Sequence, residues 1–295
     1  MRKILLKQSQ SPGDILAMSR GVADLKDSFP DWEIDVQCPC MAIWENNPRL
    51  TPLKETDNGV ETFDIDYPEV NNSGWSGIHF TEAFTKSIED KLQVKIKRTG
   101  MRPEIWISEL EKTWINQVEV AFGWKGKFWV INAGYKPDNE LKNYFHWQEV
   151  VDLFNKEFPE IKLVQVGDPN HIHPKLTGVL DLVGKTDARE LIRLIWCAQG
   201  TIGPISYQMH LSGAFKQPAV IVAGGKEPIR WEMYPNHRYL AVNGCLRCAD
   251  YDGCWLGGKL ENCKDLVNGK PKCYEMITPQ EIVKAVKDYY IGGIL

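Results

Sequence analysis

The sequence predicts an α/β protein built from two Rossmann-like, doubly wound domains that face each other across a cleft. Short apolar segments alternate with helical patterns along most of the chain, which is typical of parallel α/β sheets. The chain has 295 residues, 43% hydrophobic and 25% charged, so it can build two cores rather than one. We place the first domain at residues 1–125 and the second at 126–295.

The first domain opens with a β-α-β pattern. Residues 4–6 form a short apolar strand, and residues 33–39 alternate like a second strand. Residues 40–77 are rich in Pro, Asn, Asp and Gly, which favours a long irregular and functional segment. Helices are predicted over 81–92 and 107–118. The first helix follows from apolar residues at spacings of three and four: Ile15, Met18, Val22, Leu25 and Phe29.

The second domain shows a cleaner alternation of strands and helices. Strands are predicted at 127–134, 161–167, 179–184, 200–203, 218–225 and 238–242. Helices are predicted at 147–158, 187–198, near His210 and from Thr278 onward. The helices from Asp187 and Thr278 each open with a capping box. Ligands of such sheets bind at the carboxyl ends of the strands, which makes Gly134 and Gly225 candidate binding residues.

Charge and hydropathy exclude several classes of protein. The net charge is −4 and Lys and Arg are spread evenly, which disfavours nucleic acid as a partner. The apolar run after Met1-Arg2-Lys3 is too short for a signal peptide, and no run approaches a membrane span. We therefore expect a cytoplasmic protein without a transmembrane segment, and peripheral membrane association stays open.

One stretch imitates a nucleotide-binding loop. Gly178 and Gly184 are separated by five residues, whereas a P-loop requires four, and a strand occupies the intervening positions. The stretch is therefore not evidence for an NTPase.

A group of cysteines lies near the end of the chain, within residues 245–273 of the second domain. Their spacing departs from that of a zinc ribbon, and reduced thiols or disulfides fit the pattern as well as a structural Zn or Fe site does. The predicted metal ligands are Cys245, Cys248, Cys263 and Cys273, with Cys254 as the alternate.

Asp14 and His210 each allow two interpretations. Asp14 follows Gly13 where a strand gives way to a helix, so it is either a helix cap or an ionisable group at a site. His210 lies at the start of a helix that follows a strand. It is either a packing residue or a neighbour of a phosphate held by helix amides.

Several segments, taken in order, resemble the glycosyltransferase family 9 heptosyltransferases. They are Gly13-Asp14, FPDWEIDV, LDLVGKTDARELIRLI, MHLSGAFKQPAVIV and MITPQEIVKAV. The resemblance covers both ends and nearly all of the second domain and is thin over 40–125. It implies a GT-B fold and inverting transfer of heptose from ADP-heptose, with lipopolysaccharide biosynthesis as the setting.

The resemblance also implies roles for individual residues. Asp14 would be the general base, and Lys142, with Lys136 as its competitor, would bind the diphosphate without a catalytic metal. The nucleotide-sugar loop matches the family at Ser206, Met209 and His210. It departs from the family at Ile205 and Tyr207, where an acidic residue and a glycine are usual. The predicted substrate-binding residues are Gly13, Gly134, Lys142, Ser206, Met209, His210 and Gly225.

The resulting hypothesis is an inverting glycosyltransferase that moves a heptose-type sugar from a nucleotide diphosphate sugar to a hydroxyl group. The acceptor would be a glycan, a lipopolysaccharide core or a protein. The alternative, suggested by Ile205 and Tyr207, is a non-catalytic sugar-nucleotide-binding or scaffold relative.

Overall fold

The computed structural model describes residues 2–66, 77–225, 229–242 and 258–292, and the chain divides into two compact units. They are Met1–Trp114 and Ile115–Leu295. The sequence placed the domain boundary at 125/126 instead. Residues 115–125 group with the second unit because the short helix α4 (Gln117–Phe122) packs against α6 (Ala188–Cys197) of that unit.

The first unit contains a parallel three-stranded sheet in the order β2-β1-β3. Its elements are β1 (Lys3–Lys7), α1 (Pro12–Ser28), β2 (Glu33–Gln37), η1 (Met41–Ile43), β3 (Val60–Asp64), α2 (Phe80–Leu92) and α3 (Glu109–Lys112). Lys7, the last residue of β1, pairs with Gln37 and with Asp64. The three strands therefore end at the same edge, where the loops after β1 and β2 begin.

Two sequence predictions for this part of the chain are wrong. Strand β3 lies inside the segment predicted to be irregular, where it gains its hydrogen bonds from β1. The helix predicted over 107–118 is two short helices, α3 and α4. The break arises because Asn116 caps a new helix, its side chain accepting hydrogen bonds from Val118 N and Glu119 N at 3.0 Å.

Helix α1 packs closely on α2 through Gly21. A Cβ atom at this position would lie 2.9 Å from Ile88 Cδ1 and 3.1 Å from the Cα atom of Thr85. The apolar stripe predicted for α1 is confirmed, because its members are fully buried: Ile15, Met18, Val22 and Leu25. Phe29, at the end of the stripe, is half-buried and stacks on Trp32 with ring centroids 4.2 Å apart.

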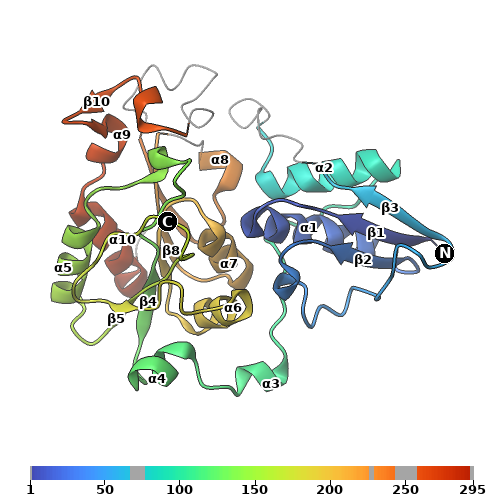
Figure 1. The fold of residues 1–295 in the computed structure, drawn as a ribbon, viewed down its shortest axis with the longest axis horizontal. Coiled ribbons are helices and arrows are strands. Elements are labelled where there is room, and N and C mark those ends of the chain that lie inside the picture. The colour runs from blue at the N-terminus through green and yellow to red at the C-terminus, as the bar shows by residue number, and fades with distance from the viewer. Residues whose placement is uncertain (1, 67–76, 226–228, 243–257, 293–295) are drawn as a thin grey trace. The chain divides into compact units, whose positions relative to one another are not determined.

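The second unit contains a six-stranded sheet in the order β6-β5-β4-β7-β8-β9, and every pairing is parallel (Figure 1). The strands are β4 (Phe128–Ile131), β5 (Lys162–Gln165), β6 (Leu180–Asp181), β7 (Thr201–Gly203), β8 (Ala219–Gly224) and β9 (His237–Ala241). The chain runs outward from β4 to β6 and then returns to add β7 on the other side of β4. The order therefore reverses between β4 and β7, which is the topological switch point of a doubly wound sheet.

Helices α5 (Trp147–Glu157) and α10 (Pro279–Ile291) pack on one face of this sheet, and α7 (Tyr207–Phe215) packs on the other. The unit also contains η3 (Glu140–Lys142), α6 and α8 (Ile229–Glu232). A smaller group follows β9: η5 (Leu260–Asn262), the antiparallel pair β10 (Leu266–Val267) and β11 (Lys270–Pro271), and α9 (Lys272–Glu275).

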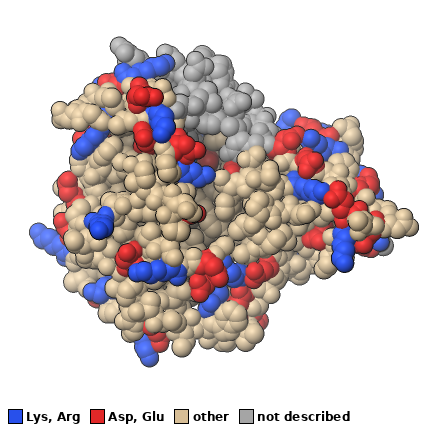
Figure 2. Space-filling view, in the orientation of Figure 1, with Lys and Arg blue, Asp and Glu red and all other residues tan. Residues whose placement is uncertain are grey.

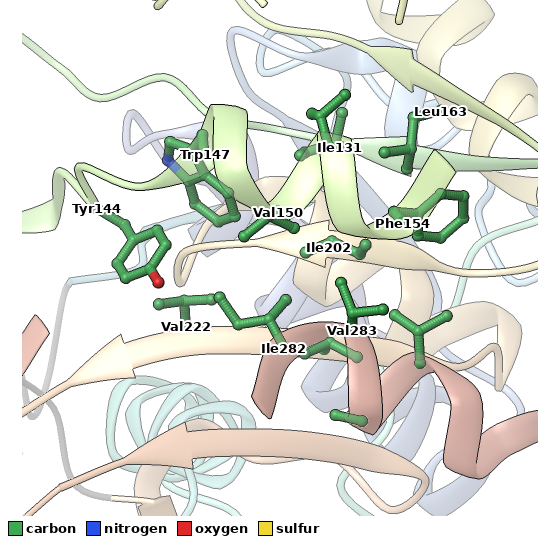
Figure 3. Packing of buried hydrophobic residues seen from close by; sticks show 14 of the residues in the cluster. Ile131, Tyr144, Trp147, Val150, Phe154, Leu163, Ile202, Val222, Ile282 and Val283 are labelled. Atoms are coloured by element: carbon green, nitrogen blue, oxygen red, sulfur yellow. The ribbon is translucent and has the colours of Figure 1, made fainter. Parts of the chain in front are cut away.

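Strand β8 shows how the core is divided between the two faces. Val220 and Val222 point into the cluster formed with α5 and α10, and Figure 3 shows Val222 beside side chains from both helices. Ala219, Ile221 and Ala223 point into a second cluster with residues of α7. Both faces are apolar because successive side chains of a strand alternate and both faces of this sheet are covered.

The last helix, α10, begins as the sequence predicts. Pro279 occupies its first turn, and Glu281 Oε2 accepts a hydrogen bond from Thr278 N at 2.7 Å. The helix is tied to the first strand of the unit, because Trp129 Nε1 donates to the Tyr290 hydroxyl at 2.7 Å.

On the face shown in Figure 2, Lys and Arg are intermixed with Asp and Glu. This agrees with the even spread of charge along the sequence. None of the helices in the described residues combines the length and the apolar character that a membrane span requires.

Candidate functional site

The switch point of the second unit brings two loops together. Asn132 follows β4, and its Nδ2 lies 3.5 Å from the Ser206 hydroxyl, which follows β7. Asn132 Oδ1 accepts a hydrogen bond from Gly134 N at 3.0 Å. The sequence analysis singled out Gly134 and Ser206 but missed Asn132, the side chain that connects them.

Ser206 is also the N-cap of α7, with an extended backbone (φ −162°, ψ 177°). The amides of a first helical turn have no partners within the helix, and they carry a partial positive charge. Gly203, at the end of β7, lets this turn approach β4 closely, because a Cβ atom there would lie 3.0 Å from Asn132 O and overlap the Gln208 amide. The arrangement suits an anionic group at the start of α7.

Lys142 reaches the loop after β7. Its ammonium group donates to Ile205 O at 3.4 Å, and its side chain is half-buried on η3. Lys136, the competitor in the sequence analysis, is exposed, and its positive charge helps to lower the pKa of His171 in the loop after β5.

Three residues of the predicted nucleotide-sugar loop are buried. Ile205 is 6% exposed and Met209 is fully buried, and both belong to the cluster beneath α7. His210 Nδ1 lies 2.7 Å from the Tyr234 hydroxyl, and the two rings meet edge to face. Burial raises the pKa of Tyr234, so its phenol stays protonated and can donate to His210. The substrate-binding roles of Met209 and His210 stay predictions.

Gly224 and Gly225 allow the segment around α9 to pack on the end of β8. A Cβ atom at Gly225 would lie 3.1 Å from Val242 O and 3.2 Å from the Cβ atom of Cys273. Gly224 has φ +62°, and a side chain there would press on the Tyr274 ring at 3.0 Å. These contacts give both glycines a packing role, and substrate binding by Gly225 stays a prediction.

The sequence analysis missed a histidine pair in the loop after β5. The His173 ring occupies the space where a Cβ atom of Gly134 or of Gly167 would lie. Its Nε2 is 2.9 Å from Asp168 O, and its buried Nδ1 has no hydrogen-bond partner among the described residues. The run GDPNHIH directly after a predicted strand was the available signal.

His171 precedes this ring by two positions, and its imidazole is near-parallel to that of His173, with centroids 6.3 Å apart. Burial lowers the pKa of His171, and the positive charge of Lys136 lowers it further, while the carboxylate of Asp168 opposes both effects. The His171 ring therefore favours its neutral form.

In the first unit, Asp14 occupies the third position of α1, and Ser11 is the N-cap. Asp14 Oδ2 accepts a hydrogen bond from Ser11 N at 3.1 Å. The carboxylate therefore has a capping function, although it is not the cap itself. Asp14 is half-buried, and it follows β1 at the edge where the strands of the first sheet end, with Gly13 directly before it. Its role as a general base stays a prediction.

Most of the predicted cysteine site lies outside the described residues, because Cys245, Cys248 and Cys254 fall within 243–257. Of the two ligands that are described, Cys263 donates through Sγ to Asp265 O at 3.4 Å, and Cys273 packs on Gly225. The described part of the chain gathers no group of three His, Cys, Asp or Glu side chains that could hold a metal. The Zn or Fe site stays a prediction.

Each unit has a parallel sheet whose strand order reverses at a switch point, and the six-stranded sheet has the strand order of a Rossmann domain. Proteins with α/β folds of this class bind nucleotides at the carboxyl ends of the strands. No protein-family model matches the chain. No curated protein matches it either. Solved structures do match it over nearly its whole length.

Three of these structures are glycosyltransferases. A glycosyl transferase of family 9 from Veillonella parvula is 13% identical with a TM-score of 0.71, covering 99% of this chain and 98% of that chain. The E. coli ADP-heptose lps heptosyltransferase II is 14% identical with a TM-score of 0.68, covering 98% of each. The iron-containing dodecameric glycosyltransferase TibC from enterotoxigenic E. coli is 16% identical with a TM-score of 0.68, covering 98% of this chain and 76% of that chain. The chain therefore has the fold of the family that its motifs resemble.

Proposed function

We propose that this chain is a glycosyltransferase that uses a nucleotide diphosphate sugar as donor. The observation that supports the proposal is the meeting of Asn132, Lys142 and Ser206 at the switch point of the second unit. An ammonium group beside the first turn of a helix suits a diphosphate, because both stabilise negative charge. The same groups would stabilise the leaving diphosphate as its charge develops.

The neighbours with this fold support the donor class that we propose. Among them, TibC was solved with ADP-D-beta-D-heptose, and the E. coli heptosyltransferase WaaC was solved with ADP. An ADP-sugar, with a heptose as the first candidate, is the donor that we propose. Ile205 stands where the family has an acidic residue, and Lys142 donates to the backbone carbonyl oxygen of Ile205.

Asp14 is the proposed general base. The acceptor hydroxyl attacks the anomeric carbon, the bond from that carbon to the diphosphate oxygen breaks, and Asp14 takes the hydroxyl proton. Attack in line with the leaving group inverts the anomeric centre. The acceptor hydroxyl would belong to a glycan, a lipopolysaccharide core or a protein.

The decisive variant is Asp14→Asn. An asparagine oxygen can still accept the hydrogen bond from Ser11 N, so the substitution removes the base and keeps the cap. Glu281→Gln is the matched control, because Glu281 caps α10 in the same way with Thr278 N at 2.7 Å. Release of ADP from ADP-heptose is measured with a panel of acceptors. We expect Asp14→Asn to lose at least about 100-fold in rate and Glu281→Gln to lose none. An unchanged rate in Asp14→Asn would remove the proposed base.

The second candidate is a non-catalytic binder of sugar nucleotides. It is favoured by Ile205, a buried residue at the family's acidic position, and by Tyr207, which opens α7 at the family's glycine. Calorimetry separates the two candidates. Binding of ADP-sugars without transfer to any acceptor of the panel would support the binder, and turnover would support the enzyme.

A further inference from the structure

Three sulfur-containing residues follow β2 within four positions of the chain. The run Cys38-Pro39-Cys40-Met41 directly follows this strand, and Cys38 Sγ lies 3.8 Å from Met41 Sδ. Both thiols are half-buried, and neither belongs to a disulfide. The two thiols are close enough that the charge of one raises the pKa of the other, as it does for Cys40.

Burial and two neighbouring N–H groups act on the Cys38 thiol in opposite directions. Burial, the largest effect, raises the pKa of Cys38, while the backbone N–H of Cys40 and the indole of Trp44 both lower it. Trp44 is only 4% exposed, and its buried Nε1 has no hydrogen-bond partner among the described residues. The backbone around Cys40 is similar, because the N–H of Ile43 lowers a pKa that burial raises to about 11. Each cysteine sulfur is thus desolvated, and a neighbouring backbone N–H partly opposes the resulting rise in its pKa.

We propose that Cys38, Cys40 and Met41 form a binding site for a soft monovalent cation of the Cu(I) class. Thiolates and thioethers are the ligands that select Cu(I) among the common metals. Without a cation, desolvation keeps both thiols protonated at neutral pH, because a buried thiolate lacks a compensating charge. A bound cation supplies that charge.

The ligand set distinguishes this cation from zinc. Structural zinc sites use four ligands drawn from Cys, His and carboxylates. The described residues bring no third ligand of these types to Cys38 and Cys40. The third sulfur here is a thioether, which favours the softer ion. On binding, each cysteine sulfur donates an electron pair to the cation and releases its proton to solvent, and the metal keeps its oxidation state.

The site lies at the edge of the first sheet where the loop after β1 also begins. Gln8 N donates to Gln37 O at 3.1 Å, which joins the start of that loop to the end of β2. No residue of the sulfur site takes part in the proposed sugar transfer, and none belongs to the cysteine group at 245–273. The inference therefore stands or fails independently of the proposed function.

Site-resolved alkylation tests the inference on the full-length, reduced protein. The protein is treated with a thiol-alkylating reagent under anaerobic, mildly alkaline conditions, with and without one equivalent of Cu(I), and the peptides are mapped by mass spectrometry. Cys197 is the internal control, because it is also half-buried and burial also raises its pKa. We expect Cu(I) to protect Cys38 and Cys40 and to leave Cys197 unchanged. Equal alkylation of Cys38 and Cys40 with and without Cu(I) would overturn the inference.

Competition against a chromogenic Cu(I) chelator then tests the ligands. The double variant Cys38→Ser/Cys40→Ser should bind one Cu(I) fewer than the wild type, whereas Cys197→Ser should bind the same number. Met41→Leu keeps both thiols and should weaken binding by about tenfold or more. Thermal unfolding of each variant checks that it folds. A double variant that folds and still binds the wild-type number of Cu(I) ions contradicts the site, and so does an unchanged affinity in Met41→Leu.

Discussion

The ammonium group of Lys142 lies 3.4 Å from the carbonyl oxygen of Ile205. Lys142 follows β4 and Ile205 follows β7, so the contact joins the two loops that meet at the switch point. Ile205 itself turns its side chain into the core beneath α7. The backbone of this residue thus contacts Lys142, while its side chain packs in the core.

Replacing Lys142 should weaken donor binding. A charge-assisted hydrogen bond to phosphate contributes about 1.5–3 kcal/mol, so Lys142→Met should bind ADP roughly 10-fold to 100-fold more weakly than the wild type. Lys136→Met is the matched control, because Lys136 is exposed and lies in the same connection after β4. Titration calorimetry with ADP measures both. Equal losses in the two variants would show a general charge effect rather than a contact of Lys142.

A methyl group at Gly134 should destabilise the second unit. The new Cβ atom would overlap the His173 ring, and displacing a packed ring costs about 1–3 kcal/mol. Gly100→Ala is the control, because no atom lies within 4 Å of the Cβ position there. Denaturant unfolding measures the difference. Adding His173→Ala to Gly134→Ala should recover part of the loss, and strict additivity of the two substitutions would contradict the predicted overlap.

His171 should make the stability of the second unit depend on pH. Because burial lowers its pKa in the folded protein, the unfolded chain takes up a proton first as the pH falls. Its contribution to stability is therefore complete above the ordinary histidine pKa of about 6.5 and is lost as the pH falls toward the lower folded value. The charged groups that act on the ring are Asp168, Lys136, His173 and Asp138. His171→Gln should flatten thermal midpoints measured from about pH 7.5 to pH 5. An identical profile in the variant would contradict this role.

The Glu89 carboxylate should stabilise the first unit. Glu89 is 6% exposed. Its carboxylate accepts hydrogen bonds from Arg98 Nη2 at 2.8 Å, from Arg98 Nη1 at 3.1 Å and from Ile96 N at 2.7 Å. The Arg98 hydrogen bond is the main reason that the pKa of Glu89 is lowered. Its contribution is therefore present above the ordinary glutamate pKa and is lost as the pH falls through the lower folded value.

At neutral pH, Glu89→Gln should lower the free energy of unfolding by about 1–3 kcal/mol. Asp90→Asn is the control, because the Asp90 and Lys86 side chains are 66% and 52% exposed in their ion pair. An exposed pair of this kind contributes about 0.5 kcal/mol or less. Urea unfolding at several pH values measures both variants. If Glu89→Gln proves no less stable than Asp90→Asn, the buried contacts of Glu89 contribute little.

The sheet of the second unit could be predicted because each strand is a short apolar segment between turn residues, and the strands between helices indicate parallel pairing. Strand β3 could not, because only five residues with alternating polar side chains form it, and its stability comes from pairing with β1. The break between α3 and α4 arises because Asn116 caps a new helix instead of continuing the first one. Tertiary contacts decide which of the two conformations such a residue adopts.

The candidate site was predictable in part for a similar reason. Gly134, Lys142 and Ser206 follow from strand ends and from the family resemblance, both of which are local in sequence. Asn132 and His173 become informative only when the loops that they join are folded together. The inward placement of Met209 likewise depends on how α7 rotates onto the sheet. Residues whose role is to connect distant loops leave little trace in a single sequence.

Helix α10 has a consequence for how the protein is made. It supplies Ile282, Val283 and Val286 to the core that also contains Trp129 of β4, although β4 and α10 are far apart in the sequence of the second unit. The ribosome releases β4 well before α10, so one side of the sheet stays uncovered while most of the unit has already been translated. Apolar surface that waits in this way favours aggregation of the nascent chain. The core of the second unit therefore stays incomplete, and open to such aggregation, until α10 has been translated.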